Sequence, residues 1–486
     1  MEEHAVNADT ASAALAEREP APTPDPRRWY AAVVLIVAFM LDLINVTIVT
    51  VALPSIQRDL RAGATDLEWI SAAYLLAFAV ALITSARLGD LFGRKRVFLL
   101  SIAAFGLTSL ACALAPNVTV LIAARVAQGL AAAGIAPQVL STIYGIFDGR
   151  ERASVFGLFG IVASVAQALG LVLGGVLVNA NLAGSGWRMV FVVSVPIAAV
   201  LVVLGARLVP ETRVPGAIRP NIWSAGVLTV GLVAVIVPLL EGSRLGWPLW
   251  CWLCLVGGVL AVVLLAVVEA RQGTRQTAPL LPADLLRIRS VGSALLIQLI
   301  VFAAFSGLLL VLTLWVQNGL GYSPLRAGVV TIALCAGAMS MAPLVGRLVM
   351  RFGRSTVGAG CVLGALGALA LLPAGLATPD VGAWSIVPGL VLLGAGINLI
   401  MPPLTTLFMA AVPARHAASA SGILSTGQQF AGALGVAVLG ALFFSTLGAG
   451  DYRAAFTTTA IVIAASMIVC APLCLMLARR EESAST

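Results

Sequence analysis

The sequence predicts an all-α protein that crosses a membrane many times. Of its 486 residues, 60% are hydrophobic and only 10% are charged. Uninterrupted apolar runs of roughly 18 to 25 residues recur along the chain, and each is long enough to span a hydrocarbon layer about 30 Å thick. A transmembrane β-barrel would show polar and apolar residues in alternation, so these runs indicate helices.

We expect fourteen spanning helices. Short loops separate the apolar runs, and most of these loops contain charged residues, which are costly inside hydrocarbon. In chain order the spans cover approximately residues 30–53, 68–88, 97–115, 118–140, 154–178, 189–208, 222–241, 248–268, 291–315, 326–350, 356–376, 384–411, 418–445 and 454–478.

The basic residues indicate how the chain is oriented in the membrane. If the N-terminus is cytoplasmic, most loop arginines and Lys95 fall on the cytoplasmic side. Because cytoplasmic loops are enriched in Lys and Arg, we expect both termini in the cytoplasm. The net charge of +8 is scattered over short loops, so it does not indicate a nucleic-acid partner. The opposite loops contain only Arg58, Arg61, Arg188, Arg244, Arg326 and Arg453.

Three segments of the first part of the chain recur in the last part. "ARLGDLFGRKR" (86–96) returns as "GRLVMRFGRST" (346–356), "IAPQVLST" (135–142) as "IMPPLTT" (400–406), and "QALGLVLGGVL" (167–177) as "GALGVAVLGAL" (432–442). The shared offset of about 260 to 265 residues indicates two homologous halves with a substrate site between them near the membrane midplane. The expected parts are a disordered cytoplasmic tail (1–28), an N-terminal six-helix half (29–208), a two-helix insertion with linkers (209–290), a C-terminal six-helix half (291–478) and a second cytoplasmic tail (479–486).

Several motifs resemble those of the major facilitator superfamily. "ARLGDLFGRKR" is similar to its signature loop, "LIAARVAQGLAAAG" to its motif with an intramembrane arginine, and "GLFGIVASVAQALGLVLGG" to the antiporter motif of drug exporters. The resemblance extends over the chain from about residue 29 and is to the fourteen-span drug:proton antiporter branch. It implies the major facilitator fold, with two six-helix halves plus two inserted central helices.

The chain departs from the family pattern at several positions. The antiporter motif has Leu171 where many members have Pro, and the second copy of the signature loop has Met350 in place of Asp. In the first span, Asn45 stands where the family often has Asp. The acidic residue of that span is instead Asp42, about one turn earlier.

Asp42 and Arg125 are predicted to lie at similar membrane depth. Asp42 is about 18 Å along its helix from the cytoplasmic start, and Arg125 is about 11 Å from the outer end of the fourth span, at 1.5 Å per residue. Neither charge would face lipid, so we expect both inside the N-terminal half, close enough to pair or to share a water. Burial favours the neutral carboxyl and a nearby arginine favours the ionised one, a balance that suits proton transport.

Other roles remain open for this group of residues. Asp42 and Arg125 can form a static structural ion pair, or they can contact substrate alone. Asn45, one turn along the same face, can hydrogen-bond Asp42 or the substrate. We take Asp42, Arg125 and Asn45 as the candidate proton-coupling residues.

The signature loop and the antiporter motif provide further candidates. The resemblance implies a gating role for the loop residues, whose charges lie too shallow for a proton relay, although basic residues here also report topology. The glycines of the fifth span have the spacing of close helix packing, and the resemblance implies a seal against substrate leak. The candidates are Gly89, Asp90, Gly93, Arg94 and Arg96 in the loop and Gly170, Gly174 and Gly175 in the motif.

Six polar or aromatic residues at membrane depth are candidates for lining a substrate cavity, although each can equally be a contact between helices. They are Gln128, Gln298, Phe302, Asn398, Gln428 and Gln429.

The sequence contains no phosphate-binding Gly-x-x-x-x-Gly-Lys-Ser/Thr motif and no clustered metal ligands, because its two histidines are far apart. We therefore expect no cofactor, no metal and no enzymatic activity, with transport driven by an ion or substrate gradient. The expected function is proton-coupled export of amphipathic drugs or antibiotics by a monomer in the bacterial inner membrane. The alternatives are a proton-coupled uptake symporter for an organic solute and a membrane scaffold or sensor that does not transport.

Overall fold

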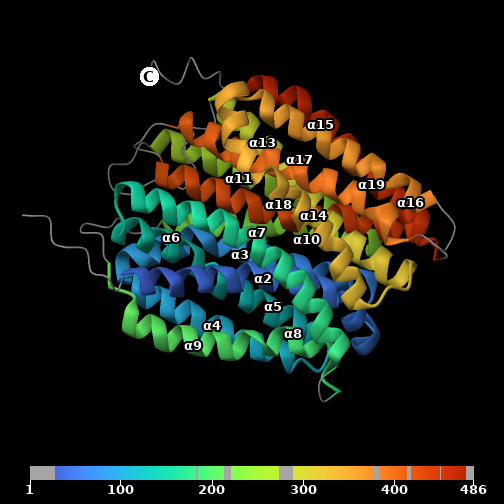
Figure 1. The fold of residues 1–486 in the computed structure, drawn as a ribbon, viewed down its shortest axis with the longest axis horizontal. Helices are drawn as coiled ribbons and strands as arrows, with labels where there is room; N and C mark the ends of the chain where they lie inside the picture. The colour runs from blue at the N-terminus through green and yellow to red at the C-terminus, as the bar shows by residue number, and fades with distance from the viewer. Residues whose placement is uncertain are drawn as a thin grey trace, which may run out of the picture.

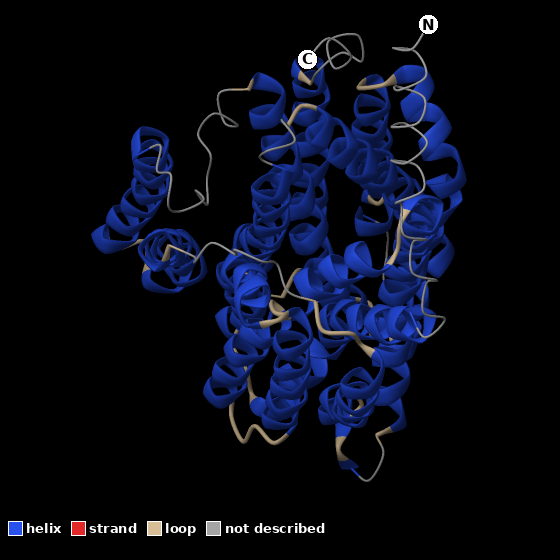
Figure 2. Cartoon of the chain, turned by 90° about the vertical axis from the view of Figure 1, so that its left-hand side faces the viewer, coloured by secondary structure: helices blue, strands red, loops and turns tan. Residues whose placement is uncertain are grey.

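The computed structural model of the protein describes residues 28–181, 184–212, 221–272, 288–376, 382–412, 417–448 and 450–477. The expected tails, 1–28 and 479–486, lie outside these ranges except for Arg28. Within the described ranges the regular elements are all helical (Figure 2).

Fourteen helical segments of the described chain are long and apolar enough to cross a membrane, which confirms the expected number. Several helices run beyond the expected spans, because helical hydrogen bonding continues past the apolar stretch. The first span, expected over 30–53, is Arg28–Leu60, and the second, expected over 68–88, is Ala64–Phe92. The fourth span, Val118–Ile146, is divided into two helices near Gly134.

The N-terminal helices form one bundle, drawn in blue to green in the lower part of Figure 1. Within it α2 packs against α7 and α9, and α5 packs against α3 and α4. The elements are α2 (Arg28–Leu60), α3 (Ala64–Phe92), α4 (Arg94–Ala113), α5 (Val118–Ala132), α6 (Ile135–Ile146), α7 (Gly149–Ala180), the short η2 (Gly186–Arg188) and α8 (Met189–Val192), and α9 (Ser194–Leu208).

The C-terminal helices form the second bundle, drawn in yellow to red in the upper part of Figure 1. Here α17 packs against α14 and α15, and α13 packs against α18. The elements are α13 (Arg289–Leu314), the π-helical η3 (Trp315–Gly319), α14 (Pro324–Phe352), α15 (Ser355–Ala370), α16 (Leu372–Leu376), α17 (Ala383–Ala410), α18 (Ala417–Leu447), α19 (Tyr452–Leu473) and η5 (Cys474–Met476).

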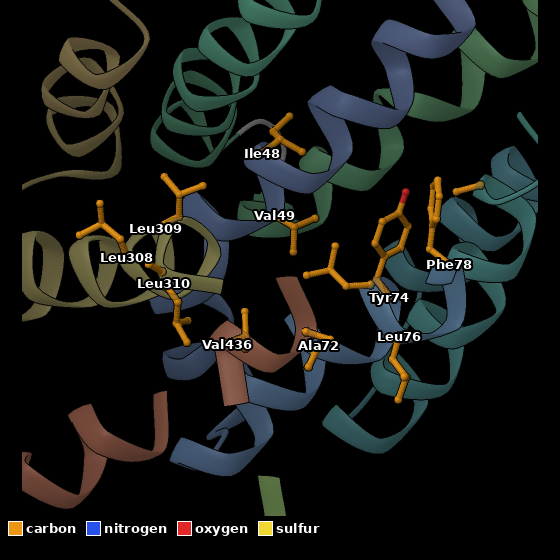
Figure 3. Packing of buried hydrophobic residues seen from close by; sticks show 14 of the residues in the cluster. Ile48, Val49, Ala72, Tyr74, Leu76, Phe78, Leu308, Leu309, Leu310 and Val436 are labelled. Carbon is orange, nitrogen blue, oxygen red and sulfur yellow. The ribbon is translucent and has the colours of Figure 1, made fainter. Parts of the chain in front are cut away.

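The two bundles meet mainly where α3 packs against α18 and α7 against α14, and α2 also contacts α13 and α14. Buried apolar side chains of α2, α3, α13 and α18 gather at this boundary, as Figure 3 shows for Val49, Ala72, Leu309 and Val436. The boundary between the halves is therefore partly a packed apolar core.

The two central helices, α10 (Ile222–Leu245) and α11 (Leu249–Gln272), pack mainly against each other. α10 also contacts α3 of the first bundle and α18 of the second. Many apolar side chains of α11 are exposed, including Trp252, Leu260 and Leu264. Such a surface suits a lipid environment, so the pair lies outside the boundary between the bundles and touches both.

Close helix approach inside the C-terminal bundle depends on missing side chains. A Cβ at Gly394 of α17 would collide with the Leu334 carbonyl oxygen of α14. Without a hydrophobic driving force between helices in lipid, van der Waals contact of this kind supplies much of the association energy.

Gly394→Leu is expected to separate α14 from α17 and to destabilise the protein by at least about 1–3 kcal/mol, the usual cost of overpacking. Gly257→Leu is the matched control, since a Cβ at Gly257 in α11 meets nothing within 4 Å. Thermal unfolding of the purified protein in detergent compares the two. Equal melting temperatures would contradict the packing interpretation.

Candidate functional site

The Arg125 guanidinium is the centre of a buried hydrogen-bond network in the N-terminal bundle. Arg125 is 2% exposed. Its Nη1 donates to Asn45 Oδ1 at 2.8 Å and to Gln128 Oε1 at 2.7 Å, and its Nε donates to the Ile70 carbonyl at 3.1 Å. Gln128 Nε2 in turn donates to Ser109 Oγ at 2.7 Å. One cation therefore links α2, α3, α4 and α5.

Asp42 is the only acidic residue of α2 within the apolar part of that helix, and it is 4% exposed. Its carboxylate accepts a hydrogen bond from the Tyr74 hydroxyl of α3. Arg125 Cζ lies 4.1 Å from the centroid of the Tyr74 ring, in cation–π geometry.

Asp42 and Arg125 thus lie in one cluster but are connected through Tyr74. Among the described residues no salt bridge joins the two charges. Instead of pairing with Arg125, Asp42 accepts a hydrogen bond from Tyr74. Arg125 donates to the neutral amides of Asn45 and Gln128. The carboxylate is therefore free to change its charge without breaking an ion pair to Arg125.

The signature loop is held by its own half of the protein. Arg94 Nη2 lies 3.0 Å from Asp90 Oδ1, and Arg94 Nη1 donates to the Ser141 carbonyl at 2.9 Å. Gly89 and Gly93 leave no room for a Cβ, because Gln138 and Glu211 lie against them. Arg96 is exposed. Asp90 therefore has a partner on the loop in this conformation.

The glycines of the antiporter motif bring α7 against both bundles. A Cβ at Gly170 would lie 2.9 Å from the Ile44 carbonyl oxygen of α2, and one at Gly174 would lie 3.0 Å from that of Ile48. A Cβ at Gly175 would lie 2.7 Å from Leu325 Cα of α14. The three small residues permit contacts that larger side chains would prevent.

A central cavity of about 1040 Å³ lies between the bundles. Asp42, Tyr74 and Arg125 are on its wall. Most of the remaining wall is apolar, with four phenylalanines among the lining residues. The predicted cavity residues that line it are Phe302, Asn398, Gln428 and Gln429.

Two predicted cavity residues, Gln128 and Gln298, do not line the cavity. Gln128 is fully buried in the Arg125 network. Gln298 of α13 donates from Nε2 to the Leu424 carbonyl of α18 at 2.5 Å. Both amides satisfy buried polar groups between helices, which corrects the prediction for these positions.

The cavity is accessible from the end of the molecule that carries the signature loop, because its wall includes Arg87 and Asp90. The opposite end is closed by contacts between the bundles. Gln317 Nε2 of η3 donates to the Val51 carbonyl of α2 at 2.9 Å, and Asn318 Nδ2 donates to Gln57 Oε1 at 3.1 Å.

Sequence reasoning missed Tyr74 and Gln317. Tyr74 could have been found from its position within an apolar span, because the hydroxyl of a buried tyrosine usually has a partner. Gln317 had no such signal, since its contact depends on the π-helical turn at Trp315–Gly319.

Comparisons with known proteins agree with this geometry. The family model described as Major Facilitator Superfamily matches residues 35–436. The chain is 36% identical over 432 residues to a probable actinorhodin transporter of Streptomyces coelicolor, covering 88% of this chain and 74% of that one. It is 37% identical over 422 residues to a puromycin resistance protein of Streptomyces alboniger, covering 86% and 82%.

A solved structure has the same fold. It is a bacterial homologue of the human lysosomal transporter Spinster, crystallised in an inward-facing and unoccupied conformation. The two chains superpose with a TM-score of 0.63 at 17% identity, over 93% of this chain and 96% of the other.

Arg125→Ala is expected to destabilise the protein strongly, because it leaves the acceptors of Asn45 and Gln128 buried without a donor. Each lost partner costs about 1–3 kcal/mol. The control Arg96→Ala removes an exposed arginine and is expected to shift the melting temperature little. A melting temperature for Arg125→Ala within error of the wild type would show that the network does not stabilise the fold.

Proposed function

Because the chain belongs to the major facilitator superfamily, we propose that it exports amphipathic antibiotics or related drugs in exchange for protons. It is a membrane transporter and not an enzyme. The relatives named for actinorhodin transport and puromycin resistance support the export direction and the substrate class.

The composition of the cavity also supports amphipathic substrates. Phe39, Phe78, Phe302 and Phe305 provide flat apolar surface on its wall, and a volume of about 1040 Å³ accommodates a drug-sized molecule. Polar side chains lie on both bundles, with Gln167 on α7 and the predicted Asn398, Gln428 and Gln429 on α17 and α18. Serine and threonine hydroxyls add further polar groups, so the wall offers both apolar surface and hydrogen bonds to an amphipathic molecule.

Asp42 is the proposed proton carrier, and the observation that carries the proposal is its place on the cavity wall. It is the one acidic side chain of the described wall besides Asp90, which lies at the open end. When ionised, Asp42 is held by the Tyr74 hydroxyl and faces the field of Arg125. When protonated, the site loses its negative charge while the Arg125 bonds to Asn45 and Gln128 remain.

Coupling of drug export to proton entry follows from the difference in charge between ionised and protonated Asp42. A substrate and a proton that compete for the cavity occupy it alternately, and the empty site must bind a proton before the bundles return to the loading conformation. Arg125 supports the proton site indirectly, through its contact with the Tyr74 ring, and Asn45 does so by accepting a hydrogen bond from Arg125. Neither contact requires a change of charge.

The signature loop is proposed as the gate at the open end. Asp90 pairs with Arg94 in the present conformation, in which that end of the cavity is accessible. Closing this end requires contacts between the bundles. The charged side chains of the loop lie on the surface of the N-terminal half and can form such contacts with the other bundle. Gly175 of α7, with α14 packed on it, keeps the opposite end closed meanwhile.

We place the protein in the bacterial inner membrane as a monomer with both termini in the cytoplasm. The distribution of basic residues supports this orientation, and the even number of spans puts both ends of the described chain on one side. The open end of the cavity then faces the cytoplasm, which is the loading conformation of an exporter.

Asp42→Asn is expected to abolish uphill export in vesicles with an imposed pH gradient, while exchange of substrate down its own gradient continues. The amide keeps the size of the side chain and cannot bind or release the proton. Asp148→Asn, at a carboxylate with 95% side-chain exposure, is the matched control and is expected to export normally. Concentration of substrate by Asp42→Asn against its gradient would contradict the assignment, and accumulation inward by the wild type would favour the uptake symporter.

Asp90→Asn is expected to lower the export rate while leaving equilibrium binding of the drug within about twofold, because the residue lies at the open end and supports a conformational step. Lys95→Gln, in the same loop, is expected to retain most activity. The measurements are drug binding by fluorescence quenching and export from inverted vesicles. A loss of binding equal to the loss of transport would identify Asp90 as a substrate contact.

A further inference from the structure

A second buried carboxylate lies outside the cavity, near the closed end of the molecule. Glu68 of α3 is 2% exposed, and its Oε2 has no hydrogen-bond partner among the described residues. It does not line the cavity and has no part in the Arg125 network. A buried polar atom without a partner is costly and requires an explanation.

Glu68 is enclosed by three helices that belong to all three parts of the chain. On one side is Gly440 of α18, where an added Cβ would lie 2.8 Å from Glu68 Oε1. On the other side is Glu241 of α10, whose Oε1 accepts from Trp69 Nε1 at 2.8 Å. The N-terminal half, the inserted pair and the C-terminal half therefore meet around this one side chain.

A titratable group of the same charge lies at this level of α3. Glu241 accepts a hydrogen bond from Trp69, the residue next to Glu68 in the chain. The basic residue at this place, Arg244, lies with its Nη2 2.7 Å from Glu241 Oε2. Among the described residues no basic side chain forms an ion pair with Glu68 itself.

The other helices packed against α3 provide no compensating charge to Glu68. α18 and α6 contain no acidic or basic residue. The basic residues of α4 lie at its start, at the end of α3 opposite to Glu68. Arg87 and Asp90 of α3 lie at the end of that helix opposite to Glu68. Other charged groups have partners elsewhere: Arg125 of α5 with Asn45 and Gln128, Arg28 of α2 with Glu151, Arg58 of α2 with the Pro54 carbonyl, Asp59 of α2 with Arg188, Asp42 of α2 with Tyr74, and Asp66 of α3 with the Gly63 amide.

An ionised Glu68 would therefore be a desolvated anion beside a second carboxylate. Removing such a charge from water without a partner is costly, and a like charge nearby adds to the cost. A proton on Glu68 removes the unpaired charge, while Glu241 stays paired with Arg244. The packing of α3 against α10 and α18 is compatible with a neutral Glu68.

We propose that Glu68 is a second proton-binding site, at the end opposite the signature loop, whose occupation stabilises the closed state of that end. The inference rests on the alternating access proposed above. Glu68 is four residues from the start of α3 and Glu241 four from the end of α10, about 6 Å from each helix terminus, so water reaches the site when the helices separate. Opening hydrates Glu68 and lets it ionise, and acid on that side drives closure.

The inserted pair gains a role from this site. α10 contributes one carboxylate and the arginine, and Trp69 of α3 donates to that carboxylate. The contact of α10, one of the two inserted helices, with α3 thereby depends on whether Glu68 is protonated. Asp42 carries the transported proton, whereas protonation of Glu68 favours closure of the outer end.

Infrared spectroscopy tests the proton directly. In protein isotopically labelled at its glutamate carboxyl carbons and held in lipid nanodiscs at neutral pH, we expect a shifted carbonyl band of a protonated carboxylic acid. The band disappears in Glu68→Gln and remains in the control Glu151→Gln, whose carboxylate is paired with Arg28. Absence of the shifted band from the labelled wild type overturns the proposal, even if Glu68→Gln does not fold.

Labelling of the closed end tests the conformational effect. Leu325→Cys, which lies against Gly175, is reacted with a membrane-impermeant maleimide in a Cys254→Ser background, because the other native cysteines are buried. As external pH falls, labelling of the wild type is expected to slow by up to about tenfold per pH unit, the limit for one proton. In Glu68→Gln it stays slow at every pH, and in Glu151→Gln it follows the wild type.

Two results would overturn the proposal: a pH dependence in Glu68→Gln equal to that of the wild type, or labelling that responds to sodium and not to pH. Asp42→Asn separates this proposal from the proposed transport function. It is expected to lose uphill export and to keep both the glutamate band and the pH-dependent labelling. A failure of the export assignment is therefore distinguishable from a failure of the Glu68 site.

Discussion

The hydrogen bonds of the Arg125 guanidinium are the interaction on which the N-terminal bundle depends. A fully buried arginine is tolerated inside an apolar helix bundle only if its donors have acceptors, and here α2, α3 and α5 each supply one. Gln128 extends the network to Ser109 of α4. Because the four helices are held at one point, the Tyr74 hydroxyl has a defined position, and so does Asp42.

Packing at the boundary between the bundles decides which end of the cavity is closed and which is open. Where glycines of α7 and α14 remove side chains, as at Gly175 and Gly328, the backbones of the two bundles approach closely and the far end is closed. Where phenylalanines and methionine occupy the wall, a cavity remains that opens at the signature loop. Access to the site from one end follows from packing that is dense at one end and incomplete at the other.

The depth argument for Asp42 and Arg125 illustrates what a sequence can and cannot predict here. Helical rise puts both residues near the same level, and both lie on the cavity wall. Their contact was different from the expectation, because the Tyr74 ring stands between them. Gln128 and Gln298 show the same limit: an amide at membrane depth can face a cavity or a neighbouring helix, and only the rotation of the helix about its axis decides.

Hydropathy alone determined the helical class and the fourteen spans, because the free energy of transferring an apolar run into lipid is a sum over neighbouring residues. The tertiary structure decided which polar groups meet. Tyr74 reaches Asp42, the π-helical turn directs Gln317 to Val51, and Glu68 comes to lie beside Glu241 of a helix far along the chain. Such contacts depend on how helices rotate and pack, and local sequence does not encode that information.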